Sequence, residues 1–212
     1  MMNSNILKNS LVPFIVLAIS GSVACGHAGA QTPHNKLMAL LSAEEYVPSA
    51  EDLARLGPGI PEQLISIASD SKADPAHRAR ALALLQFYPD NVDVQTYLNR
   101  FLAQDDQSST LVRPALLALA KVSKGNAVPT ISRHLSSKDV LIREGAADAL
   151  VLTEDPAAAS ILKTHASVEK DAFLRKRMEE MIVRQTEKTD KTVTTPSVKG
   201  GRKSPKTNKT QQ

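Results

Sequence analysis

Aromatic residues and cysteine are scarce in this 212-residue chain, and Trp is absent. Aromatic side chains make up 3% of the sequence. Because proteins commonly hold bases by stacking them on aromatic rings, this scarcity argues against a stacking platform for bases or sugars. A core with few aromatic rings must be built from Leu, Ala, Ile and Val, which suits helices that approach one another closely.

The only cysteine, Cys25, lies in an N-terminal segment that has the features of a secretory signal. Residues 11–19 are apolar, and the stretch of low polarity extends to about Ala24, which is too short to span a bilayer comfortably. An A-x-A motif that ends at Ala30 follows it. We therefore expect residues 1–30 to be a signal peptide and the protein to be exported, as a periplasmic or secreted protein. The mature chain would begin at Gln31 and contain no thiol.

A second interpretation makes the protein a lipoprotein that is anchored to a membrane. The sequence Val23-Ala24-Cys25-Gly26 resembles the end of a lipobox, in which the chain is cut before the cysteine and lipidated on it. Ser22 occupies a position where that motif usually has Leu, Val or Ile. Both interpretations place the mature protein outside the cytoplasm, where nucleic acid is a poor target, so we expect no nucleic-acid partner.

Charge is distributed unevenly along the chain. Residues 31–183 contain 17 Lys and Arg against 20 Asp and Glu, a net charge of −3. Residues 184–212 contain 8 against 2, a net charge of +6, and have little apolar content, so we expect a disordered basic tail. The tail is a candidate for binding anionic lipid or cell-wall polymer. Its densest basic part contains Lys199, Arg202, Lys203 and Lys206.

Arginines recur at nearly even spacing in the central part of the chain. They are Arg78, Arg113, Arg143 and Arg175, separated by 35, 30 and 32 residues. Each comes four positions after a residue that can cap a helix, and small or apolar residues mostly follow at helical spacing. The capping residues are Asp74, Ser109, Asp139 and Asp171. A period in this range is typical of a solenoid of helical hairpins.

Each arginine-bearing segment is expected to be the second helix of a hairpin. The predicted first helices span residues 61–68, 93–102, 128–135 and 156–163. Residues 35–57 predict an atypical leading hairpin, in which Ser49 and Asp52 resemble a capping box and Gly57 can end the helix. No alternating strand pattern of useful length is present. We therefore expect an all-α fold, an α-α superhelix of four to five hairpins.

The repeated frame resembles HEAT-type repeats, particularly the short form near 30 residues found in many bacterial proteins. The matching features are the apolar residue before Arg113, Arg143 and Arg175, the Ala/Leu run that follows, and the opening of a first helix at residues 127–131. The resemblance covers roughly residues 58–183. The predicted order is a signal peptide (1–30), a linker and capping hairpin (31–57), HEAT-like repeats (58–183) and a basic tail (184–212).

The resemblance also assigns roles to charged side chains. In HEAT-like stacks such arginines commonly bond to neighbouring loop acids or carbonyls, so we interpret Arg78, Arg113, Arg143 and Arg175 as a structural ladder. A row of four guanidiniums along a ligand groove is the alternative. Second helices usually line a concave surface that binds partners. The outward-pointing candidates on it are Arg80, Glu144, Asp148, Lys176, Arg177 and Glu180.

The sequence indicates a non-catalytic function. The histidines have no spacing suited to a shared metal, and no phosphate-binding loop, Ser-His-Asp signature or cysteine nucleophile is present. We therefore expect no catalytic residue, cofactor or metal, and an exported scaffold or adaptor for an unidentified protein partner. The alternative is an envelope-tethering protein that uses its basic tail. An enzyme like the HEAT-like lyases or hydroxylases is a third, less favoured hypothesis.

Overall fold

The computed structural model describes residues 32–43 and 45–193 of the chain. The predicted signal peptide, Cys25, and the basic residues from Lys199 to Lys206 lie outside the described residues. Within the described ranges the fold is all-α: helices and short 3-10 turns, with no strand. Among these residues, no helix combines the length and the apolar character that crossing a membrane requires.

Two short helices begin the described chain. Helix α1 (Pro33–Ser42) starts at Thr32, whose hydroxyl accepts a hydrogen bond from the Asn35 N–H. Helix α2 (Ala50–Ala54) has the capping box that the sequence predicts: the Asp52 N–H donates to the Ser49 hydroxyl, and the Asp52 carboxylate accepts from the Ser49 N–H. Such reciprocal bonds satisfy the free N–H groups of a helix start.

The rest of the described chain forms helical hairpins. In each pair the two helices contact one another. The pairs are α3 (Ile60–Ser69) with α4 (Pro75–Leu84), α5 (Val92–Leu102) with α6 (Ser109–Ser123), α7 (Val128–Arg133) with α8 (Val140–Leu152), and α9 (Ala157–Ala166) with α10 (Ala172–Val193). The 3-10 turns are η1 (Leu85–Phe87), η2 (Lys124–Ala127) and η3 (His134–Ser136). The four predicted first helices are therefore present, each within a few residues of its expected bounds.

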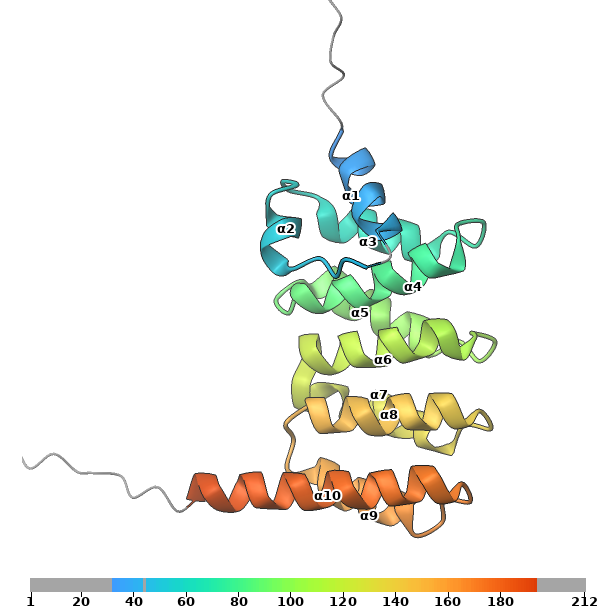
Figure 1. The fold of residues 1–212 in the computed structure, drawn as a ribbon, viewed down its shortest axis with the longest axis vertical. Coiled ribbons are helices and arrows are strands. Elements are labelled where there is room, and N and C mark those ends of the chain that lie inside the picture. The colour runs from blue at the N-terminus through green and yellow to red at the C-terminus, as the bar shows by residue number, and fades with distance from the viewer. Residues whose placement is uncertain (1–31, 44, 194–212) are drawn as a thin grey trace, which may run out of the picture. The chain divides into compact units, whose positions relative to one another are not determined.

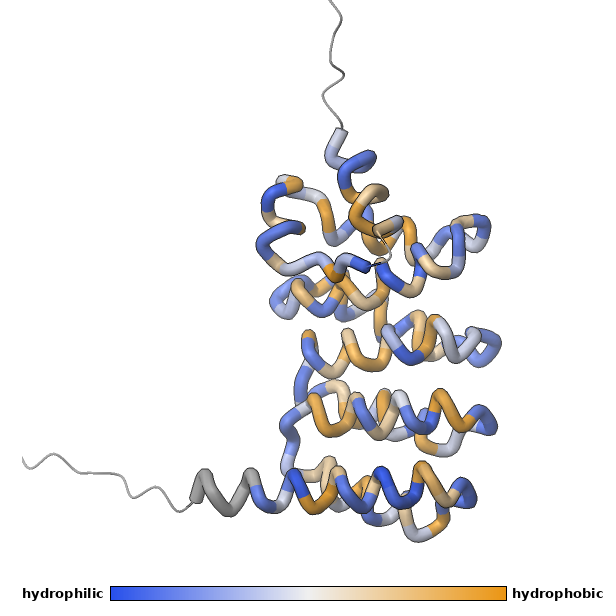
Figure 2. Tube along the Cα trace, viewed as in Figure 1, coloured by the Kyte–Doolittle hydropathy of each residue, from blue (hydrophilic) through white to orange (hydrophobic). Residues whose placement is uncertain are grey.

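The second helices of successive hairpins pack against one another. Contacts run from α4 to α6, from α6 to α8 and from α8 to α10, as Figure 1 shows for this part of the chain. Hydrophobic and hydrophilic residues alternate along these helices (Figure 2), and the buried ones form one core made largely of Leu and Ala. Gly145 lets α8 pack close to α6, because a Cβ at this position would lie 2.9 Å from Cγ of Arg113.

Three of the four predicted helix caps are confirmed. The side chain of Asp74 accepts a hydrogen bond from the Ala76 N–H, that of Asp139 from the Leu141 N–H, and that of Asp171 from the Leu174 N–H.

The cap predicted at Ser109 is wrong by one residue. Ser109 is already helical, and the N-cap of α6 is Ser108, whose backbone is extended (φ −66°, ψ 150°). The Ser108 carbonyl accepts from the Val112 N–H at 2.9 Å. Arg113 therefore comes five positions after its cap rather than four. Since each helical residue turns by about 100°, its side chain leaves the helix on a different face.

Helix α10 continues ten residues beyond the predicted end of the repeats at residue 183 and reaches Val193. The prediction of a disordered tail from residue 184 onward is therefore wrong for residues 184–193, which are helical. Residues 184–193 contain neither Pro nor Gly, and Arg184 pairs with Glu180 one turn earlier at 3.5 Å. Helix propensity and such pairs can continue a helix that has already formed.

Candidate binding face

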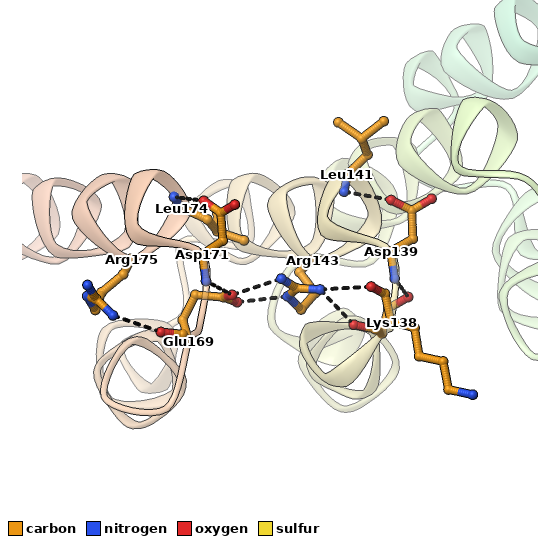
Figure 3. A network of polar contacts seen from close by, with 9 residues as sticks. Lys138, Asp139, Leu141, Arg143, Glu169, Asp171, Leu174 and Arg175 are labelled. Carbon is orange, nitrogen blue, oxygen red and sulfur yellow. Dashed lines mark hydrogen bonds and ion pairs between the residues drawn. The ribbon is translucent and has the colours of Figure 1, made fainter.

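Arg143 and Arg175 meet the same acidic loop residue, Glu169 (Figure 3). Nε and Nη2 of Arg143 each donate to a carboxylate oxygen of Glu169 at 2.8 Å. Arg143 Nη1 also donates to the carbonyls of Ser137 and Lys138, at 3.0 and 3.1 Å. Arg175 Nη1 donates to the Glu169 carbonyl at 3.0 Å. These bonds tie the loop before α8 to the loop before α10.

Glu169 is one of the few charged side chains buried in the described structure, with an exposed fraction of 8%. Its carboxylate also accepts the Asp171 N–H at 2.8 Å. The hydrogen bonds from Arg143 hold the pKa of Glu169 below its ordinary value, and the same pair raises the pKa of Arg143. Burial opposes both shifts but does not outweigh them, so both side chains of the pair are charged.

Arg78 and Arg113 make different contacts from this pair. Arg78 Nε donates to the carbonyl of Ala68 at the end of α3, at 3.0 Å. Among the described residues Arg113 bonds to neither a loop acid nor a carbonyl; its Nη2 lies 3.2 Å from Asp148 and 4.0 Å from Glu144, both on α8. Val112 occupies the buried position four residues after the cap instead. Arg78, Arg143 and Arg175 therefore bond to a carbonyl or a loop acid, but of these three only Arg143 reaches another hairpin, through Glu169. Arg113 leaves its helix on a different face.

Arg113 belongs to a network of four charges that crosses three helices. Arg177 of α10 places Nη1 2.7 Å from Glu144 and Nη2 2.8 Å from Asp148. We call Arg113, Glu144, Asp148 and Arg177 the charge network. Its formal charges cancel, and hydrogen bonding to Asp148 raises the pKa of Arg177. Each of the four side chains lies within 4.0 Å of both opposite charges, and each is only 17–40% exposed.

A cleft of about 620 Å³ opens beside the charge network, lined mainly by α8 and α10. We call it the α8–α10 cleft. Its apolar lining contains Leu117, Val151, Leu152, Phe173 and Met181. Its charged lining contains Asp148, Lys176, Arg177, Glu180 and Arg184. Phe173 is 74% exposed although it is large and apolar, and Leu152 is 38% exposed.

The structure brings together most of the side chains predicted for the binding surface. Asp148, Lys176, Arg177 and Glu180 line the α8–α10 cleft, and Glu144 lies beside them in the charge network. The remaining candidate, Arg80, lies elsewhere. Its guanidinium donates to the carbonyls of Ala43 and Tyr46, so it fastens the segment between α1 and α2 onto α4 and does not point outward as expected.

Sequence reasoning missed the apolar half of this surface. Phe173 and Leu141 each stand two positions after a capping aspartate, and both are exposed, by 74% and 49%. An apolar residue in the first turn of a helix, on a side that the core does not use, was the available signal. The surface therefore contains an exposed aromatic ring beside its charges, because Phe173 lines the cleft.

Within the described ranges no three His, Cys, Asp or Glu side chains are grouped so that they could hold a metal ion. No protein-family model matches the chain, and no curated protein matches it either.

Proposed function

We propose that this protein is an exported, non-catalytic helical-repeat scaffold that binds a protein partner on the face formed by α6, α8 and α10. The observation that carries the proposal is the exposure of Phe173 in a cleft beside a fixed set of charges. A large exposed aromatic ring gains most when a partner covers it, and aromatic and Arg side chains dominate the energetics of protein interfaces. The stacked hairpins support a HEAT-like solenoid, whose extended faces typically serve as binding surfaces.

The charge network favours binding because it is already ordered. Arg177 is held by both Glu144 and Asp148, so binding immobilises few additional rotamers there. Ordering a long side chain costs about 0.5–1.5 kcal/mol when it is free. A preorganised rim next to an apolar cleft therefore binds more tightly than the same residues would if they were mobile.

The test is a pull-down from an envelope fraction of the native host, with the wild-type protein and two variants as bait. Phe173→Ala removes the ring in the cleft, and Val168→Ala is the matched control, because Val168 is also exposed (71%) but lies outside the cleft. We expect a partner that the wild type and the Val168 variant retain and the Phe173 variant loses. Equal retention by all three would exclude this face.

The charge distribution supports a second candidate function, tethering to an anionic envelope surface through the tail. Residues 184–212 carry a net charge of +6, whereas residues 31–183 carry −3. Binding of this kind weakens with salt, because exposed charges are screened over about 8–10 Å at physiological ionic strength. Removal of the tail from the bait separates the two functions: tethering requires the tail, and the scaffold function does not.

A further inference from the structure

We propose that the occupant of the α8–α10 cleft is an acidic protein segment that carries a large apolar side chain. This inference rests on the scaffold function proposed above and specifies the chemistry of the partner. Phe173 and Leu152 supply exposed apolar surface for the side chain. The charged residues around Phe173 and Leu152 determine which charge is favoured in the residues of the bound segment on either side of that apolar side chain.

The carboxylate of Asp148 is already saturated by cations. One of its oxygens lies 3.2 Å from Arg113 and the other 2.8 Å from Arg177. Glu144 is likewise bonded to Arg177 at 2.7 Å. A basic ligand would have to displace a guanidinium to reach either carboxylate, and would leave that guanidinium unpaired on a partly buried face.

The cations at the edge of the cleft form fewer ion pairs than Asp148 and Glu144 do. Lys176 is exposed and forms no ion pair within the described part of the chain. Arg184 is 74% exposed, and it pairs at 3.5 Å with Glu180, which is itself 51% exposed. Lys176 and Arg184 can both bind a carboxylate of a ligand without breaking a buried ion pair. The charged lining has three cations against two anions, in a protein body whose net charge is −3.

The same charges argue against two other occupants. Residues 194–212 of this chain contain five Lys and Arg and no acid, so the chain's own tail matches the cleft poorly. A basic partner segment would be repelled in the same way. Like-charge juxtaposition across an interface suppresses the wrong partners, and opposite charge raises the rate of encounter.

The experiment is a selection of random 12-residue peptides displayed on phage against the immobilised protein, followed by binding of the enriched peptides to purified variants. The inference predicts that enriched peptides contain Phe, Leu, Ile or Met next to Asp or Glu. It also predicts that Lys176→Glu weakens their binding by about tenfold and Phe173→Ala by at least about tenfold. Lys163→Glu, which makes the same charge change on α9 outside the cleft, should leave binding unchanged.

The outcomes separate the inference from the proposed function. Enriched peptides that are basic, or that bind the Lys176→Glu and Lys163→Glu proteins equally well, would overturn the acidic-segment inference but leave a peptide-binding scaffold. A selection in which nothing is enriched, or in which Phe173→Ala has no effect, would overturn both. Near-identical melting of all variants is expected, because every substituted side chain is exposed.

Discussion

Replacing Glu169 by glutamine tests the buried pair that joins the third and fourth hairpins. The wild-type carboxylate accepts two hydrogen bonds from Arg143 at 2.8 Å and one from the Asp171 N–H. Glutamine keeps the size but has no charge and only one acceptor oxygen. It leaves at least one guanidinium N–H of a side chain that is 16% exposed without its acceptor.

The expected loss of stability follows from this geometry. Breaking a buried ion pair by removing one partner costs about 3–5 kcal/mol. Arg143 keeps the carbonyls of Ser137 and Lys138, and the oxygen of the introduced amide can still accept one bond, so we expect about 2–3 kcal/mol for Glu169→Gln. For a chain of this size, that loss corresponds to a fall in Tm of roughly 4–12 °C.

Thermal unfolding followed by circular dichroism measures this change. The matched control is Glu179→Gln, because Glu179 is an exposed glutamate on α10. Its effect should stay within about 0.5 kcal/mol. If the Glu169 and Glu179 variants melt at the same temperature, the pair contributes nothing and its assignment as a structural tie is refuted.

Other expected outcomes follow from the same structure. The pKa of Glu169 is lowered on folding, so its carboxylate contributes fully to folding stability above the ordinary pKa near 4.5, and this contribution is lost as pH falls through the folded pKa. The Tm difference between wild type and Glu169→Gln should therefore shrink below about pH 4.5. Arg143→Ala should cost about 2–4 kcal/mol in urea unfolding, whereas Arg113→Ala should cost about 0–1 kcal/mol because Arg113 is 40% exposed; a reversed order would contradict the contacts described. Deleting residues 194–212 should leave Tm nearly unchanged, because Val198 is their only large apolar residue, and should reduce salt-sensitive binding to anionic vesicles; a fall of many degrees would show that the tail packs on the helices.

Periodicity was sufficient to predict the helices and most of their caps. Asp74, Asp139 and Asp171 cap helices as expected, because a carboxylate just before an apolar helical pattern can accept hydrogen bonds from the free N–H groups of the first turn. Ser108 and Ser109 are chemically identical candidates, and the one-residue difference between them decides where Arg113 points. Local sequence does not resolve that choice, since it depends on how α6 packs against its neighbours.

The polar half of the candidate face could be predicted, and the apolar half could not. Positions counted from the arginines found Asp148, Lys176, Arg177 and Glu180. Phe173 was missed because an apolar residue in a helical repeat is expected to be buried, and only the packing of α8 against α10 shows that its ring is exposed. The prediction that Arg80 points outward was wrong because the segment between α1 and α2, which has no counterpart in the later hairpins, supplies carbonyl acceptors for its guanidinium.

Photocrosslinking from the cleft in the native host tests directly whether a partner binds there. A benzophenone amino acid is placed at Phe173 in one protein and, as control, at Lys163 on α9 in another. We expect a discrete protein adduct from position 173 that is absent from position 163 and strongly reduced when Lys176→Glu is added. An absent adduct, or the same adduct from both positions, would contradict the proposal that this protein binds its partner in the α8–α10 cleft.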